Sequence, residues 1–149
     1  SSASSEHPMP FDVSIAMLRR HGRWLLQLRD DIDGIAAPGC WGLFGGHLES
    51  GETAEQALQR ELIEEIGWCP ANVRLWIRHS TAERTAHVFL GELQRDLHLL
   101  ELNEGQDMVL ASAAELRTGQ ILSPRLNELR PLAPTLKLLT GRLQDIQSD

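Results

Sequence analysis

Glutamates are concentrated in one short stretch of the sequence, GGHLESGETAEQALQRELIEEIGW, which covers residues 45–68. Residues 53–66 have the apolar spacing of a helix, and Glu61, Glu64 and Glu65 are three or four positions apart within it. Side chains at these spacings lie on the same side of a helix. Because neighbouring carboxylates repel one another, such a cluster needs either full solvation or a cation among its members.

Two interpretations of this cluster are open. A solvated acidic face is the usual state of a Glu-rich helix. A site for divalent cations is favoured here by the pair Gly45-Gly46, because glycine lets main-chain oxygens approach a ligand closely. Carboxylate and carbonyl oxygens are the ligands that Mg²⁺ prefers. Mg²⁺ held there would bind a diphosphate and lower the pKa of a bound water, so the stretch predicts phosphate chemistry.

Other elements must position this acidic segment. Thr53 is the expected N-cap of its helix and Gly67 the expected left-handed C-cap, while Leu58, Leu62 and Ile66 form an apolar stripe that should pack on a sheet. Strands are expected at 11–18, 24–28, 73–80, 85–93 and 106–110, with a hairpin turn at 21–22, a loop at 30–39, a short helix at 113–117 and a terminal helix at 131–143. Hairpin-paired strands with a few packed helices predict an α+β domain.

The bulk composition sets outer limits on function. The 149 residues fit one domain, and we expect residues 9–149 to form it, with residues 1–8 as a disordered lead-in or cloning remnant before a native start near Met9. A net charge of -7 argues against a non-specific nucleic-acid binder, and no apolar run is long enough for a membrane span. Cys40 and Cys69 lack zinc-ligand spacing, so small buried side chains and a cytoplasmic location are expected.

The acidic segment resembles the Nudix box, whose pattern is G, five residues, E, seven residues and then R-E-U-x-E-E-x-G-U, with U a bulky aliphatic residue. The fixed positions are filled by Gly46, Glu52, Arg60, Glu61, Leu62, Glu64, Glu65 and Gly67. Trp68 stands where an aliphatic residue is usual, and Phe44 stands where many relatives have proline. Neither departure removes a candidate ligand. The chain is thus similar to MutT-like members of the Nudix hydrolase family.

This resemblance implies a fold and a metal site. The fold would be a Nudix-type α/β/α sandwich with a central mixed β-sheet and a loop-helix-loop catalytic motif. Arg60 would orient the glutamates by pairing with Glu52. A further acid on a loop before a late strand often supplies a ligand or base in MutT-like relatives, and Glu104 in the segment NEGQ resembles it. The implied metal ligands are Gly45, Gly46, Glu61, Glu64, Glu65 and Glu104.

The activity implied is hydrolysis of the diphosphate linkage of a nucleoside diphosphate derivative. A water activated by Mg²⁺, or by Mn²⁺ as an alternative, would attack phosphorus, with Glu61 or Glu104 as the base. The expected partner is a small nucleotide-like substrate, without nucleic acid or membrane, and a homodimer is expected by analogy only. The alternative is a catalytically silent nucleotide sensor, although such modules usually lose glutamates from the box and this chain keeps them.

Substrate contacts are less well marked in the sequence. Arg29 lies where MutT-like relatives place an arginine near the substrate, and Asn127 resembles a late Pro-x-Asn segment that reads a nucleobase in some of them. Arg125 could bind a phosphate. Exposed strand residues that could face the cleft are Arg78, His79, Arg84 and His87. The residues and motifs outside the box that are typical of dinucleoside polyphosphate, NADH, ADP-ribose and coenzyme A hydrolases are missing from this sequence. The expected substrate is therefore a nucleoside triphosphate or a nucleotide sugar.

Overall fold

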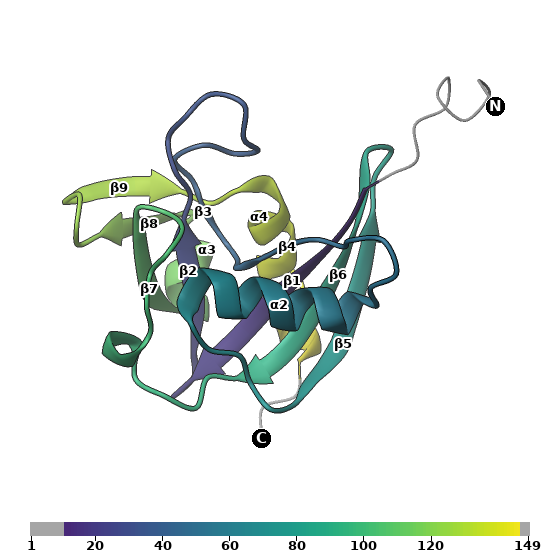
Figure 1. Cartoon of the computed structure of the whole chain (residues 1–149). Coiled ribbons are helices and arrows are strands. Elements are labelled where there is room, and N and C mark those ends of the chain that lie inside the picture. The colour runs from purple at the N-terminus through teal and green to yellow at the C-terminus, as the bar shows by residue number, and fades with distance from the viewer. Residues whose placement is uncertain (1–10, 147–149) are drawn as a thin grey trace.

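A mixed sheet of seven strands forms the centre of the computed structural model, which describes residues 11–146 (Figure 1). The expected lead-in at residues 1–8 and the start near Met9 lie outside the described residues. The strands are β1 (Phe11–Arg20), β2 (Arg23–Leu28), β3 (Trp41–Gly42), β4 (Gly45–His47), β5 (Val73–Ser80), β6 (Arg84–Glu92) and β7 (Asp107–Ser112). The order is β3-β2-β1-β6-β5, with β4 paired to β1 and β7 paired to β2. Among the strand pairs of this sheet within residues 11–146, β1 and β6 run parallel and the others are antiparallel.

Helices cover both faces of this sheet. Because side chains alternate along a strand, Ala16 and Leu18 of β1 pack towards α2 (Ala54–Ile66), whereas Met17 packs into the opposite cluster. That second cluster includes residues of α3 (Ala113–Arg117) and α4 (Pro134–Thr140). The predicted α+β fold, an α/β/α sandwich around a mixed sheet, is confirmed.

The termini of α2 follow local sequence rules. Thr53 accepts a hydrogen bond from the Gln56 amide, and the Gln56 side chain accepts one from the Thr53 amide, which completes a capping box. Gly67 ends the helix at a φ of 70°, a left-handed conformation that glycine adopts without steric penalty. Leu58 and Leu62 are fully buried against the sheet, as their spacing predicted.

The C-terminal third differs most from the sequence-based prediction. A two-stranded hairpin, β8 (Gln120–Ser123) and β9 (Glu128–Pro131), occupies a segment for which no element was expected before residue 131. The prediction that the terminal helix begins at residue 131 was wrong, because Pro131 pairs with Gln120 in β9 and the Ala133 amide donates to the Trp41 carbonyl. The helix begins only at Pro134, where a missing amide is harmless.

Within the described residues, two short 3-10 helices lie at Leu97–Leu99 and Leu143–Asp145. Within residues 11–146, no helix has both the length and the apolar character that crossing a membrane requires.

Candidate active site

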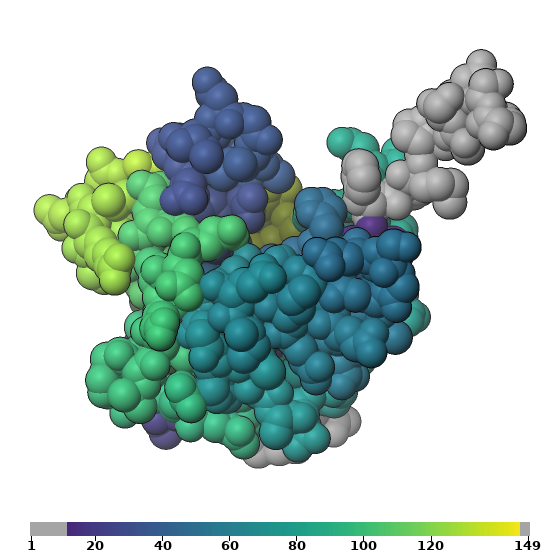
Figure 2. Space-filling view, viewed as in Figure 1, coloured from purple at the N-terminus to yellow at the C-terminus, as the bar shows by residue number. Residues whose placement is uncertain are grey.

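Segments distant in sequence line one cavity of about 670 Å³. Among the lining residues, Gly46 comes from β4, Glu61 and Glu65 from α2, Arg29 from the position after β2, and Glu104 from the loop before β7. In the space-filling view, the β2–β3 loop rises above the surface formed by α2, and the segment that precedes β7 lies beside that helix (Figure 2). The tertiary fold therefore gathers most of the predicted site residues around one space.

The glycine pair places backbone where a side chain would not fit. Gly45 has a φ of 146°, and a Cβ added there would lie 2.0 Å from the Ser14 carbonyl oxygen. A Cβ added at Gly46 would lie 2.2 Å from Glu61 Oε2. The Gly45 amide donates to Glu65 Oε1 at 2.8 Å. Because both residues lack a Cβ, β4 lies directly against the carboxylates of α2.

Burial and like charge destabilise the ionised form of two glutamates. Burial is the main reason that the pKa of Glu65 is raised to about 9, the Glu104 carboxyl raises this pKa as well, and the hydrogen bond from Gly45 opposes both. Burial also raises the pKa of Glu61, Glu64 adds to this rise, and Arg60 counters it. A cation bound among these groups would stabilise their ionised forms.

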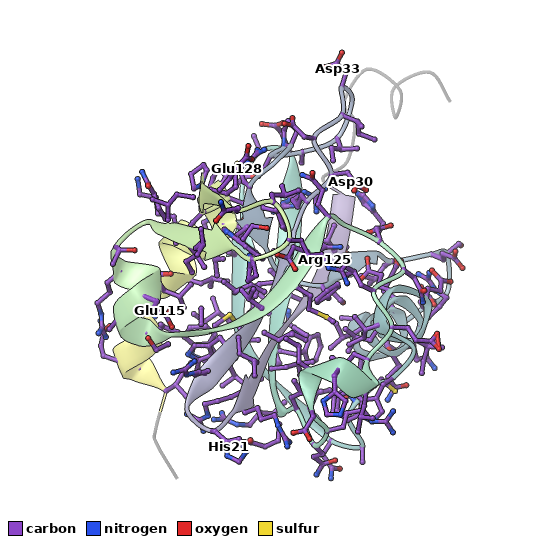
Figure 3. All side chains as sticks on the ribbon, turned by 90° about the vertical axis from the view of Figure 1, so that its left-hand side faces the viewer. His21, Asp30, Asp33, Glu115, Arg125 and Glu128 are labelled. Atoms are coloured by element: carbon purple, nitrogen blue, oxygen red, sulfur yellow. The ribbon has the colours of Figure 1, made fainter. Side chains whose placement is uncertain are left out.

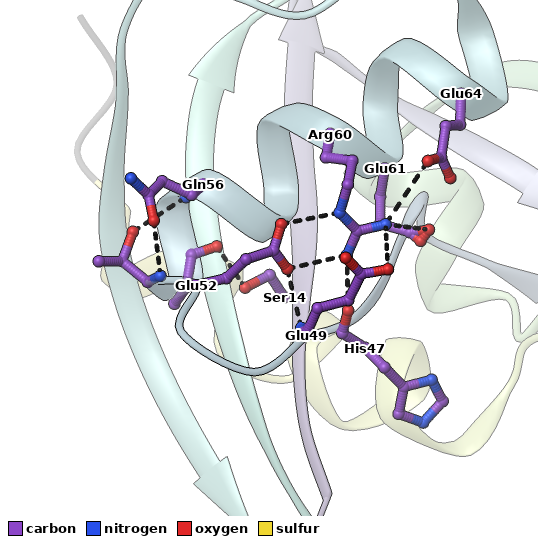
Figure 4. Close-up of polar contacts among 10 residues, drawn as sticks. Ser14, His47, Glu49, Glu52, Gln56, Arg60, Glu61 and Glu64 are labelled. Atoms are coloured by element: carbon purple, nitrogen blue, oxygen red, sulfur yellow. Dashed lines mark hydrogen bonds and ion pairs between the residues drawn. The ribbon is translucent and has the colours of Figure 1, made fainter.

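Arg60 links Glu52 to the glutamates of α2. Its Nε donates to Glu52 Oε2 at 2.7 Å and its Nη2 donates to Glu52 Oε1 at 2.9 Å, a bidentate pair that lowers the pKa of Glu52 to about 2 (Figure 4). Nη2 also donates to the His47 carbonyl at 3.0 Å. Nη1 lies 3.6 Å from both Glu61 and Glu64. The pairing expected between Arg60 and Glu52 is therefore present, and it joins the loop after β4 to α2.

The donor set fits a hard divalent cation. Glu61, Glu64, Glu65 and Glu104 offer carboxylate oxygens, and the glycines of β4 leave room for main-chain oxygen. Across residues 11–146, no three His, Cys, Asp or Glu side chains are already arranged around a single metal position. Glu61 is only 15% exposed and lines the cavity, whereas Glu64 is 57% exposed and, like Glu52, is not among the lining residues.

Two amide side chains hold the Glu104 loop in place. Gln27 is 2% exposed and donates from Nε2 to the Glu104 carbonyl at 3.0 Å. Asn103 donates from Nδ2 to the Glu64 carbonyl at 3.0 Å, which fastens the same loop to α2. Sequence reasoning missed Gln27. The sequence clue to Gln27 is that it is the one polar residue after Arg23 in the strand RWLLQL, whose remaining residues are apolar.

The predicted substrate residues fall into two groups. Arg29 lines the acidic cavity and donates from Nε to the Ala36 carbonyl at 2.6 Å. Arg125 and Asn127 instead lie in the β8–β9 turn, and the Arg125 side chain is 63% exposed beside Asp107 at 3.7 Å (Figure 3). Neither of them lines the acidic cavity, so the structure does not bring them together with the carboxylates.

Comparison with known proteins agrees with this architecture. The nucleoside triphosphatase NudI of Escherichia coli O139:H28 is 45% identical over 51 residues, which is 34% of this chain, and the chain spans only 36% of that relative. A MutT NUDIX hydrolase structure from Burkholderia pseudomallei aligns with a TM-score of 0.68 at 22% identity, covering 91% of this chain and 98% of that one.

A second similar structure is the NUDIX domain of Shewanella oneidensis NrtR complexed with ADP ribose. It aligns with a TM-score of 0.69 at 15% identity, covering 95% of this chain and 90% of that one. At these identities the two structures show a shared fold. The model of the NUDIX domain family matches residues 9–131, which is most of the chain. This protein therefore belongs to the NUDIX domain family.

Proposed function

We propose that this protein hydrolyses the diphosphate linkage of a nucleoside diphosphate derivative, either a nucleoside triphosphate or a nucleotide sugar. The observation that carries the proposal is the meeting of Glu61, Glu65 and Glu104 against Gly46, on the wall of a cavity that also contains Arg29. Mutually repelling carboxylates can bind divalent metal ions, and the nearby Arg29 guanidinium suits the negative charge of a polyphosphate ligand that binds with those ions.

The carboxylates would bind the metal ions, and one of them would accept the proton of the attacking water. Glu61, Glu64, Glu65 and Glu104 would bind Mg²⁺ or Mn²⁺ together with a main-chain carbonyl of Gly45 or Gly46. Bound divalent ions supply charge screening for the diphosphate and a coordinated water of lowered pKa. Glu61 or Glu104 would accept the proton of the attacking water, and Arg60 would keep the helix carboxylates oriented through its pair with Glu52.

The relatives support a nucleotide-like substrate. The curated relative is described as a nucleoside triphosphatase, and the NrtR NUDIX domain was solved with ADP ribose. The first matches over about a third of each chain and the second shares the fold, so the substrate of this protein is part of the proposal. A cytoplasmic location and a homodimer stay predictions.

Release of phosphate-bearing products tests the proposal directly. Nucleoside triphosphates, nucleotide sugars, ADP-ribose and dinucleoside polyphosphates would be incubated with and without Mg²⁺, and products separated by ion-exchange chromatography. Glu64→Gln is expected to lower turnover by at least about 100-fold while thermal melting is unchanged, because it removes a candidate ligand that is largely exposed. Glu55→Gln, an exposed glutamate in the first turn of the same helix that is not a candidate ligand, is the control. Near wild-type turnover in Glu64→Gln would contradict the assignment.

A catalytically silent nucleotide sensor is the alternative. Calorimetry with Mg²⁺ and a nucleotide analogue, run beside the product assay, separates the two functions. Binding accompanied by turnover supports the hydrolase, whereas binding without turnover of any substrate in the screen supports the sensor.

A further inference from the structure

Another cavity, of about 330 Å³, opens at the far end of the sheet from the acidic one. Arg19 near the end of β1, Trp24 near the beginning of β2 and Leu90 near the end of β6 are among its lining residues. It shares no lining residue with the acidic cavity, which β1 lines through Val13 and Ile15. The two cavities therefore lie towards opposite ends of β1, and we call this one the distal cavity.

Apolar side chains and cations share the wall of the distal cavity. Trp24 is 4% exposed and Leu90 is 7% exposed, and both turn apolar surface towards this space. The charged lining residues are Arg19, Arg74 and Glu92. Two arginines against one glutamate leave one net positive charge here, in a chain whose net charge is -7. The distal cavity is thus a cationic place on an acidic protein.

The protein leaves the donors of both arginines available. The Arg19 guanidinium lies over the Trp24 ring, 5.3 Å from its centroid, and within residues 11–146 it donates no side-chain hydrogen bond. Its ion pair with Glu92, at 3.7 Å, involves a carboxylate that is 63% exposed. Among the same residues, Arg74 makes neither a side-chain hydrogen bond nor an ion pair. Planar guanidinium groups with unused donors bind oxyanions in pairs of hydrogen bonds.

We propose that the distal cavity is a binding site for a small carboxylate that carries an apolar or aromatic group. Arg19 and Arg74 bind the carboxylate, and the apolar group contacts Trp24 and Leu90. One net positive charge suits one negative charge, because Glu92 would repel the second charge of a phosphate monoester. The volume of about 330 Å³ is at the lower end of the range for small-molecule sites, which favours a ligand of the size of an aromatic acid.

Benzoate and benzamide test the site, because they are similar in shape and differ in charge. Their binding to the full chain would be measured by titration calorimetry and by ¹H-¹⁵N NMR spectra in EDTA, so that no divalent metal occupies the acidic cavity. Benzoate should bind with a Kd of about 1 mM or tighter. Benzamide lacks the charge and acetate lacks the apolar group, so each should bind at least about tenfold more weakly. The Trp24 indole and Gly91 amide signals should shift with benzoate, and the Gly46 amide signal should not.

Variants of the charged lining residues test the carboxylate contact. Arg74→Gln should weaken benzoate binding by at least about tenfold and leave benzamide binding within about twofold. Its melting temperature should not change, because Arg74 is exposed. Arg117→Gln is the matched control, since Arg117 is an exposed arginine on α3 that lines none of these cavities. Glu92→Gln should tighten benzoate binding by about twofold to fivefold, because it removes a repelling charge beside Arg19.

The outcomes decide this inference without reference to hydrolysis. Equal affinity for benzoate and benzamide, or unchanged benzoate affinity in Arg74→Gln, would overturn it. Shifts confined to signals of the acidic cavity, or no benzoate binding at millimolar concentrations, would overturn it as well. Because every measurement is one of binding in EDTA, failure of the proposed hydrolase activity leaves the distal site standing, and failure of the distal site leaves the activity standing.

Discussion

Replacing Gly46 with alanine separates the position of Glu61 from the stability of the fold. The added Cβ would lie 2.2 Å from Glu61 Oε2, whereas ordinary contacts begin near 3.4 Å, so the carboxylate must retreat by about 1.2 Å. The atoms that must move form the far end of a flexible side chain, and Gly46 is not among the residues with positive φ. We therefore expect the fold to accommodate the alanine.

Displacement of a catalytic group by about 1 Å lowers the rate by roughly 100-fold, which corresponds to about 2.7 kcal/mol of activation free energy. We expect Gly46→Ala to lose about this factor in kcat/KM for Mg²⁺-dependent hydrolysis, with a melting temperature within a few degrees of wild type. Steady-state kinetics and circular dichroism melts measure the two quantities on the same samples.

Two further glycines provide the comparisons. Gly141→Ala should leave both activity and melting unchanged, because Gly141 ends α4 at a φ of -68° and its added Cβ meets only the Leu138 carbonyl, at 3.4 Å. Gly45→Ala should unfold at lower temperature, since its Cβ would lie 2.0 Å from main-chain oxygen at a φ of 146°. Wild-type kcat/KM in Gly46→Ala would refute the reasoning that the Glu61 carboxylate must lie against a bare backbone.

Three further perturbations test the elements around the site. Gln27→Met removes the side-chain donor to the Glu104 carbonyl and should lower kcat/KM by about tenfold, and an unchanged value would show that the loop is held without it. Thr53→Ala removes the cap of α2 and should lower the unfolding free energy by about 1 kcal/mol, measured by urea titration; a loss below 0.3 kcal/mol contradicts this. The hydrogen bond from the Ser112 amide lowers the pKa of Glu115 in the folded state. The ionised Glu115 carboxylate therefore stabilises the fold above its ordinary pKa of 4.5, and this stabilisation is lost as pH falls through the folded pKa. Melting of Glu115→Gln and wild type should therefore converge below that pH, and a constant difference would exclude the linkage.

The sequence predicted an element correctly where the contacts that define the element lie within its own segment. The caps of α2 and the apolar stripe that begins at Leu58 follow from side chains within the helix, and the structure agrees with both. The β8–β9 hairpin was missed for the opposite reason. Its turn depends on Asp107, a buried carboxylate from β7 that accepts hydrogen bonds from Ser123 Oγ and the Arg125 amide. A contact from a residue so distant in sequence leaves no local pattern.

The sequence by itself determined the helix with its three candidate metal ligands and the family resemblance, and the resemblance implied the pairing of Arg60 with Glu52. The ligand cluster follows from spacing along one short segment, because residues three or four positions apart lie on the same side of a helix. Tertiary structure alone decided that Gln27 holds the Glu104 loop and that Arg29 and Arg84 line the same two cavities, the acidic one and a neighbouring one of about 460 Å³. Such neighbours arise from strand pairing and from the packing of α4 over the sheet, which bring together residues that no spacing along the chain relates.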